Sequence, residues 1–205
     1  MNIGIIGATG NLGKILTEKF INEGIEPTAI IRNKNKMHIT IPTIVKDLYE
    51  LTTEDIKNFD IVINAFNAPV DEPEQFITSM KHLISIFKHT DTCLMIAGGA
   101  GILAVSEDTL LVETPDVPEE FKPIAEAEVD AYRLLENEQS FDWMYMAPAA
   151  LMTTDLPYKG VHHFSGDKLG VNEEGQSEIS YEDYAEAFVE KALHPQNHQI
   201  IGVYS

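Results

Sequence analysis

The chain has 205 residues, of which 44% are hydrophobic, so it is long enough to form one domain, residues 1–205, with a sizeable core. Its formal net charge of −19 argues against nucleic acid or an anionic membrane as a partner. The single cysteine, Cys93, cannot form an intramolecular disulfide, and we find neither a signal-peptide pattern nor an apolar run long enough to cross a bilayer. We therefore expect a cytoplasmic protein without membrane or nucleic-acid partners.

The charge is unevenly distributed along the chain. Residues 1–50 contain six basic and five acidic side chains, whereas the remaining 155 residues contain eight basic and 28 acidic ones. A polyanionic ligand needs a site that does not repel it. We therefore expect any such site in the first quarter of the chain, while the acidity of the rest is explained by solubility.

Apolar runs alternate with amphipathic segments along most of the chain. Their periodicity predicts strands at residues 3–6, 26–32, 43–46, 60–65, 92–97, 141–147 and 200–204. It predicts helices at residues 12–23, 51–58, 74–89, 122–138 and 181–193. Residues 103–121 and 149–177 carry loop signals, with a short hairpin in the second segment. This alternation indicates an α/β protein with a doubly wound parallel sheet, the Rossmann fold, whose small irregular segments cover the substrate.

A glycine-rich run, Gly7-Ala-Thr-Gly-Asn-Leu-Gly13, follows the first predicted strand and leads into the first helix. This order leaves backbone N–H groups at the helix start facing an incoming anion, and glycine lets the backbone approach a pyrophosphate closely. An ordinary glycine-rich turn is the alternative, but the strand before and the helix after are the context that a dinucleotide motif requires. The candidate cofactor contacts here are Gly7, Thr9, Gly10, Asn11, Leu12 and Gly13.

Arg32 ends the second predicted strand, at the place where an acidic residue would bind the ribose 2′-hydroxyl of NAD. An arginine can instead hold the 2′-phosphate of NADP, and Asn33, Lys34 and Lys36 follow it. A solvated basic turn is the alternative. Against the acidic remainder of the chain, Arg32 and Asn33 favour NADP(H) as the cofactor over NAD(H).

The ends of three further strands supply the other candidate contacts, because the carboxyl ends of parallel strands lie along one edge of a sheet. They are Asp47 and Leu48 for the adenine, Asn64, Ala65 and Phe66 for the ribose and pyrophosphate, and Gly98, Gly99 and Ala100 for the approach of the nicotinamide ring. Each is also compatible with an ordinary turn between a strand and a helix.

Several common catalytic arrangements are missing from the sequence. None of the seven tyrosines is followed four positions later by a lysine, so the acid pair of conventional short-chain dehydrogenases is absent. The adjacent His162 and His163 would point to opposite faces of an extended segment, so we expect no metal site. Cys93 lies inside a predicted strand, where we expect a buried packing residue rather than a nucleophile.

The sequence resembles the atypical short-chain dehydrogenase/reductase proteins, in particular the biliverdin-IXβ/flavin reductases and bacterial proteins of the NADH-flavin reductase type. The matching pieces are Gly7 to Gly13, Ile31-Arg-Asn33, Gly98-Gly-Ala-Gly101, Asp142-Trp143 leading to Ala147-Pro-Ala149, and Ile179-Ser-Tyr-Glu-Asp-Tyr-Ala185. The first half is shared with NmrA-like redox sensors. The resemblance implies hydride transfer from a nicotinamide to a flat ring stacked over it, with protonation by solvent. It implies that Pro148, Ala149 and Ala150 border the nicotinamide.

Three functions remain open at this point. The first is an NADPH-dependent reductase of a flavin, a quinone or a similar planar small-molecule acceptor, in a pocket closed by residues 102–121 and 150–177. The second is a non-catalytic NADP-binding redox sensor. The third is an epimerase-like sugar-nucleotide enzyme, which the missing tyrosine–lysine pair and the short C-terminal part disfavour. We expect a monomer or a weak homodimer, and the catalytic residues stay unassigned.

Overall fold

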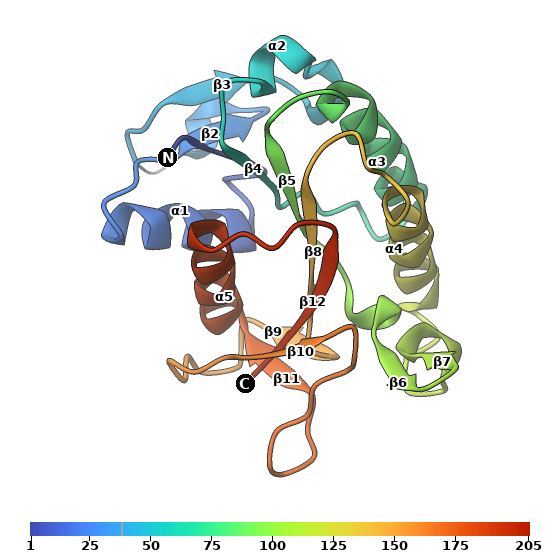
Figure 1. The fold of residues 1–205 in the computed structure, drawn as a ribbon. Helices are drawn as coiled ribbons and strands as arrows, with labels where there is room; N and C mark the ends of the chain where they lie inside the picture. The colour runs from blue at the N-terminus through green and yellow to red at the C-terminus, as the bar shows by residue number, and fades with distance from the viewer. Residues whose placement is uncertain (38) are drawn as a thin grey trace.

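The computed structural model describes residues 1–37 and 39–205, which form an eight-stranded sheet with helices on both faces (Figure 1). In spatial order the strands are β10 (His163–Gly166), β12 (Gln199–Tyr204), β8 (Trp143–Pro148), β5 (Cys93–Ala97), β4 (Ile61–Asn64), β1 (Ile3–Ile6), β2 (Thr28–Ile31) and β3 (Thr43–Val45). All neighbours are parallel except β10 and β12. The predicted Rossmann fold is confirmed, with the strand order reversing between β1 and β4.

The helices form one layer on each face of the sheet. They are α1 (Asn11–Asn22), α2 (Thr53–Ile56), α3 (Glu74–Phe87), α4 (Lys122–Leu135) and α5 (Tyr181–Leu193). Helices α1 and α5 pack against each other on one face, and α3 packs against α4 on the other, with α2 beside α3 (Figure 1). Short buried runs that are mostly apolar, such as Ile61–Asn64, form strands here because both of their faces are covered.

Alternate residues of the strands feed two separate cores. Ile5 belongs to a cluster with Phe20 of α1 and Phe188 of α5. Its neighbour Ile6 belongs to a cluster on the other face with Leu83 of α3. The sheet is therefore buried on both sides, as the apolar strand patterns predict.

In the part of the chain that the structure describes, the connections contain four short 3₁₀ helices. These are η1 (Lys34–Lys36), η2 (Leu48–Glu50), η3 (Ala100–Ile102) and η4 (Leu111–Glu113). The predicted helix 51–58 is reduced to α2, at whose start Asp55 Oδ2 accepts the backbone N–H and the hydroxyl of Thr52, both at 2.8 Å.

Two predictions for the segments outside the sheet's main strands are wrong. Residues 103–121 are not uniformly irregular, because β6 (Ala104–Ser106) and β7 (Thr109–Leu110) form a small antiparallel pair. The hairpin expected within residues 149–177 does not form. Instead β9 (Leu151–Thr153) pairs in parallel with β11 (Glu178–Ser180), and β10 joins the edge of the main sheet. The strands of the pairs β9–β11 and β10–β12 are distant in sequence, so no turn signal between them marks the pairing.

Cys93 is buried within β5, as predicted, and burial raises the pKa of its thiol to about 12, which leaves it protonated and unreactive. The two adjacent histidines take different partners. His162 Nε2 lies 2.9 Å from Glu190 Oε2, whereas the ring of His163 packs against Tyr204. The described residues contain no cluster of three or more potential metal ligands, and none of their helices is both long and apolar enough to cross a bilayer.

Candidate functional site

A cavity of about 490 Å³ opens at the carboxyl ends of β1, β2, β4 and β5. This is the edge of the sheet at which ligands bind in open α/β folds. Most of the predicted cofactor contacts line it together, namely Gly7, Thr9, Gly10, Asn11, Leu12, Arg32, Asn33, Asp47, Leu48, Ala65, Phe66 and Gly98. The predicted contacts Gly13 and Asn64 do not line the wall.

The turn between β1 and α1 requires glycine at both ends. Gly7 has φ +79°, and a Cβ there would lie 2.8 Å from the backbone oxygen of Ala65. A Cβ at Gly13 would collide with the backbone of Gly7 and lie 2.7 Å from the Cα of Ala8. Gly13 therefore acts by letting α1 approach the end of β1, and this approach positions the helix start at the cavity.

The start of α1 is suited to an anion. Gly10 is the N-cap, no side chain caps the helix, and its first turn has no acidic residue. The first-turn N–H groups of a helix have no partner within the helix, and the helix dipole is positive at this end. Asn11 and Leu12 bring these groups to the cavity wall, while the Gly10 amide donates to the backbone oxygen of Gly7 at 2.8 Å. The donors and the space left by the missing Cβ atoms fit a diphosphate.

Basic side chains gather where β2 and β3 end. Arg32, Lys36 and Lys46 line the cavity here. The Arg32 side chain is 77% exposed, and its Nη1 lies 3.9 Å from Asp47 Oδ2. Lys46 is held by Asp55 at 2.7 Å. Arg32 thus keeps most of its donors for a ligand, which is the behaviour expected of a phosphate-binding arginine.

Asn33, Asp47 and Asn64 have local structural roles besides their places at strand ends. The Asn33 side chain accepts the N–H of Asn35 at 2.9 Å and caps η1. The Asp47 side chain accepts the N–H of Tyr49 at 3.0 Å and caps η2. The Asn64 side chain is buried and accepts the N–H of Phe66 at 3.2 Å, which shapes the turn after β4. These short polar side chains therefore fix the backbone from which their neighbours reach the cavity.

Of the residues expected near the nicotinamide ring, Gly98 lies on the cavity wall and the others do not. Of the strand ends β5 and β8, the wall includes Ala97 and Gly98, but not Gly99, Ala100, Pro148, Ala149 or Ala150. A Cβ at Gly98 would collide with the ring of Tyr145, and one at Gly99 would collide with the carboxyl group of Glu128. The missing Cβ atoms at this turn therefore make room for two side chains of the protein itself.

Sequence reasoning missed several residues at this end of the cavity. Glu128 of α4, Met152 of β9, and Tyr181 and Tyr184 of α5 all line it. Of the two segments expected to close the pocket, residues 150–177 contribute Met152, and no residue described in 102–121 is on the wall. Tyr181 and Tyr184 follow the helix-capping Ser180 at helical spacing, and this pattern could have placed both side chains near the start of one helix. Nothing in the sequence distinguishes Glu128 from its acidic neighbours.

Burial controls the ionisation of the polar groups at this end. Desolvation raises the pKa of Glu128 to about 7. Burial raises the pKa of Tyr145 and of Tyr184 well above their usual range, and the nearby Glu128 adds to both shifts. The Tyr145 hydroxyl accepts the N–H of Gly99 at 3.2 Å, and the Tyr184 hydroxyl donates to the backbone oxygen of Met146 at 2.7 Å. Both tyrosines are therefore neutral and hydrogen-bonded to the strand ends.

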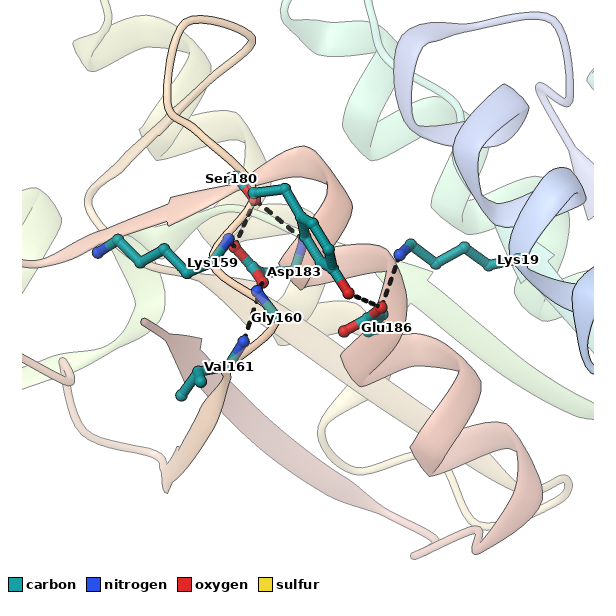
Figure 2. A network of polar contacts seen from close by, with 8 residues as sticks. Lys19, Lys159, Gly160, Val161, Ser180, Asp183 and Glu186 are labelled. Atoms are coloured by element: carbon teal, nitrogen blue, oxygen red, sulfur yellow. Dashed lines mark hydrogen bonds and ion pairs between the residues drawn. The ribbon is translucent and has the colours of Figure 1, made fainter.

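Asp183 ties α5 to the segment that precedes β10 (Figure 2). Its buried carboxylate accepts backbone N–H bonds from Lys159 at 3.0 Å, Gly160 at 2.8 Å and Val161 at 3.2 Å. It also accepts the hydroxyl of Ser180 at 2.6 Å, while Ser180 Oγ caps the helix at Asp183 N. These charge-assisted bonds fix the start of α5, from which Tyr181 and Tyr184 reach the cavity.

Glu186, one turn further along α5, links the two helices on this face (Figure 2). Its Oε1 accepts Lys19 Nζ of α1 at 2.7 Å and the Tyr158 hydroxyl at 2.6 Å. The two helices that border the cavity are therefore held to each other and to the 158–161 segment.

Comparisons with known proteins agree with this geometry. The sequence profile of a family described as NAD(P)H-binding matches residues 7–195. The uncharacterized protein YwnB of Bacillus subtilis (strain 168) is 38% identical over 201 residues, which cover 96% of this chain and 94% of YwnB.

Solved structures are also similar over almost their whole length. The crystal structure of SP1627 from Streptococcus pneumoniae TIGR4, described as "a putative NADH-flavin reductase", is 35% identical with a TM-score of 0.94, covering 100% of this chain and 99% of that one. A "putative epimerase" from Bacteroides thetaiotaomicron is 29% identical with a TM-score of 0.85, covering 99% and 96%. The profile match and the relatives show that the chain belongs to the NAD(P)H-binding family, with a Rossmann-like fold that binds a nicotinamide cofactor.

Proposed function

We propose that the chain is an NADPH-dependent reductase that transfers hydride to a flavin, a quinone or a similar planar acceptor. The observation that carries this proposal is the layout of one cavity. Backbone amides lie at its middle, cations at its β2–β3 end, and apolar and aromatic side chains at its β5 end. A dinucleotide has its diphosphate, adenosine and reactive ring in the same spatial order. The similarity to SP1627, described as "a putative NADH-flavin reductase", supports the reaction class.

The chain's own groups divide the cofactor between them. The first-turn amides of Asn11 and Leu12 would bind the diphosphate, and Arg32 would bind the 2′-phosphate of NADPH. Arg32 suits this role because no acidic residue ends β2 and its guanidinium is largely exposed. Leu48, buried on the wall at the end of β3, would pack against the adenine.

The cofactor, when bound, supplies the hydride and its electron pair. The chain supplies orientation, since Met152 and Tyr181 present apolar and aromatic surface beside the end of β5, against which flat rings can pack. Gly98 lines the cavity there. Gly99, Ala100, Pro148, Ala149 and Ala150 stay predictions for the nicotinamide border.

The test is a steady-state assay of NADPH and NADH oxidation with FMN and with menadione as acceptors. We expect turnover with at least one acceptor, and a lower KM for NADPH than for NADH. Binding of each dinucleotide is measured in parallel by calorimetry. Binding without turnover of either acceptor would reject the reductase.

A non-catalytic redox sensor is the second candidate, favoured by the absence of a tyrosine–lysine acid pair. It predicts tight binding of NADP and no oxidation of NADPH by any acceptor. The epimerase-like alternative, to which the Bacteroides thetaiotaomicron structure is relevant, predicts conversion of a sugar nucleotide without net NADPH consumption. Absence of heat with both dinucleotides would contradict all three functions.

A further inference from the structure

Glu128 places a carboxyl group at the β5 end of the cavity, and the function proposed above does not use it. It lies in α4 and lines the cavity with Gly98 and Tyr184. Its carboxyl packs into the space that a Cβ at Gly99 would occupy. The cations lie at the β2–β3 end of the cavity and the helix start that would hold the diphosphate lies at its middle. The Glu128 carboxyl is therefore at the remaining end, where the reactive ring would be.

Within residues 1–37 and 39–205, no cation pairs with the carboxyl. The titratable groups that face it are the phenols of Tyr145 from β8 and Tyr184 from α5, and the ring of Tyr132, on the next α4 turn, meets that of Tyr145 edge to face with centroids 5.1 Å apart. Among the described residues, Glu128 makes no hydrogen bond of its own and no ion pair. Its hydrogen-bonding capacity is therefore left for a ligand in the cavity.

Glu128 is half-buried, and a desolvated carboxyl without a partner is costly; such costs are retained mainly at functional sites. Here desolvation is the cause that raises the pKa of Glu128 to about 7, so both protonation states are populated near neutral pH. A neutral carboxylic acid can donate a proton, and the conjugate base can recover one from solvent through the open cavity. Position and ionisation together suit an acid that acts once per turnover.

We propose that Glu128 is the general acid of this site, and that its acceptor is a carbonyl compound of the quinone class. This inference rests on the proposed reductase function. The acceptor takes a hydride and its two electrons from NADPH, which becomes NADP⁺. The Glu128 O–H bond breaks as a new O–H bond forms on the acceptor oxygen, so the quinone becomes a hydroquinone. The Glu128 carboxylate then takes a proton from water.

The same residue discriminates between acceptors. Reduction of a quinone creates negative charge on an oxygen, which a neutral acid stabilises by protonating it. A flavin spreads the added charge over its ring system, and its reduced form is stable as an anion near neutral pH. Loss of Glu128 should therefore affect quinone reduction far more than flavin reduction.

The experiment compares the wild type with Glu128→Gln and with the matched control Glu126→Gln, which makes the same change at an exposed position of the same helix. With menadione we expect kcat of Glu128→Gln to fall by about 100-fold or more, in the range usual for a general acid. The decline of the wild-type kcat as pH rises through about 7 should disappear in this variant. The KM for NADPH and the rate with FMN should change by less than about threefold, and Glu126→Gln should match the wild type.

Infrared difference spectroscopy gives a readout that does not need turnover. The cofactor-free wild type should show a protonated-carboxyl band that is lost as pH rises through about 7, is shifted by menadione, and is absent in Glu128→Gln. If Glu128→Gln reduced menadione with the kinetics and pH profile of the wild type, or if the wild type showed no such band, the role of Glu128 would be overturned, but the reductase function would stand. Reduction of FMN but not menadione by the wild type would overturn the acceptor class and the acid. Reduction of neither would overturn the reductase as well.

Discussion

Replacing Glu128 with glutamine should stabilise the cofactor-free protein, and only at higher pH. The carboxyl has a pKa of about 7 in the folded state, against the ordinary value of 4.5 for a solvated glutamate. Between these two values the folded state binds more protons than the unfolded state, so the free energy of unfolding falls as pH rises. The destabilisation caused by ionising the desolvated Glu128 carboxyl is absent below about pH 4.5 and fully present above about pH 7. Glutamine has a similar shape and never ionises, so it does not incur this penalty.

The magnitude follows from the size of the shift. Each pKa unit corresponds to about 1.4 kcal/mol, so a shift from 4.5 to about 7 corresponds to about 3 kcal/mol. Because the carboxyl also faces the open cavity, solvent reduces this figure. We expect Glu128→Gln to gain about 1–3 kcal/mol relative to the wild type between pH 5 and pH 8.5.

The assay is urea unfolding of the wild type, Glu128→Gln and Glu126→Gln at about pH 5 and about pH 8.5, without dinucleotide. The difference between each variant and the wild type cancels the contribution of the other acidic residues. Glu126→Gln, at an exposed position, should show no pH-dependent difference. If the stability difference for Glu128→Gln were the same at both pH values, the carboxyl would not be desolvated in the folded state.

Three further predictions test the site. Arg32→Ala should weaken NADPH binding by roughly 10- to 100-fold, which is the usual contribution of a charge-assisted hydrogen bond, and should leave NADH binding nearly unchanged. Calorimetry with both dinucleotides measures the two losses. Equal losses would contradict a role of Arg32 in binding the 2′-phosphate. Gly13→Ala should destabilise the protein by about 2 kcal/mol or more and abolish dinucleotide binding, because the new Cβ would collide with the backbone of Gly7. The control is Gly10→Ala, whose new Cβ would lie 3.2 Å from the nearest atom, the backbone oxygen of Gly7. In thermal melts this control should be less destabilised than Gly13→Ala. Asp183→Asn should cost about 2–4 kcal/mol in urea unfolding, because the amide cannot replace the carboxylate as acceptor of three backbone N–H groups and a hydroxyl. An unchanged midpoint for Asp183→Asn would mean that the 158–161 segment is held by other contacts.

The succession of strands and helices along the chain and the glycine turn before α1 could be predicted from the sequence, because both depend on local signals. Apolar runs mark the strands, and the glycines between Gly7 and Gly13 mark a turn that other residues cannot form. One general rule, that parallel strands end along a common edge, then brings Arg32, Ala65 and Gly98 to a single cavity. Each inference needed only neighbours in sequence and the handedness of the crossovers.

The far end of the cavity depends on packing between distant elements, and the sequence contains no local signal for it. β9 pairs with β11 rather than with β10, and Met152 reaches the wall as a result. The position of Gly99 at the end of a predicted strand suggests a place beside the nicotinamide ring, but the space next to it is filled by Glu128, from a helix some 30 residues later in the chain. Which of the acidic residues on α4 faces the sheet is decided by how that helix packs on β5 and β8. The sequence alone therefore determines where the glycine turn and the start of α1 lie, and the tertiary structure alone decides which acidic side chain reaches the β5 end of the cavity, because burial and proximity are properties of the packed chain.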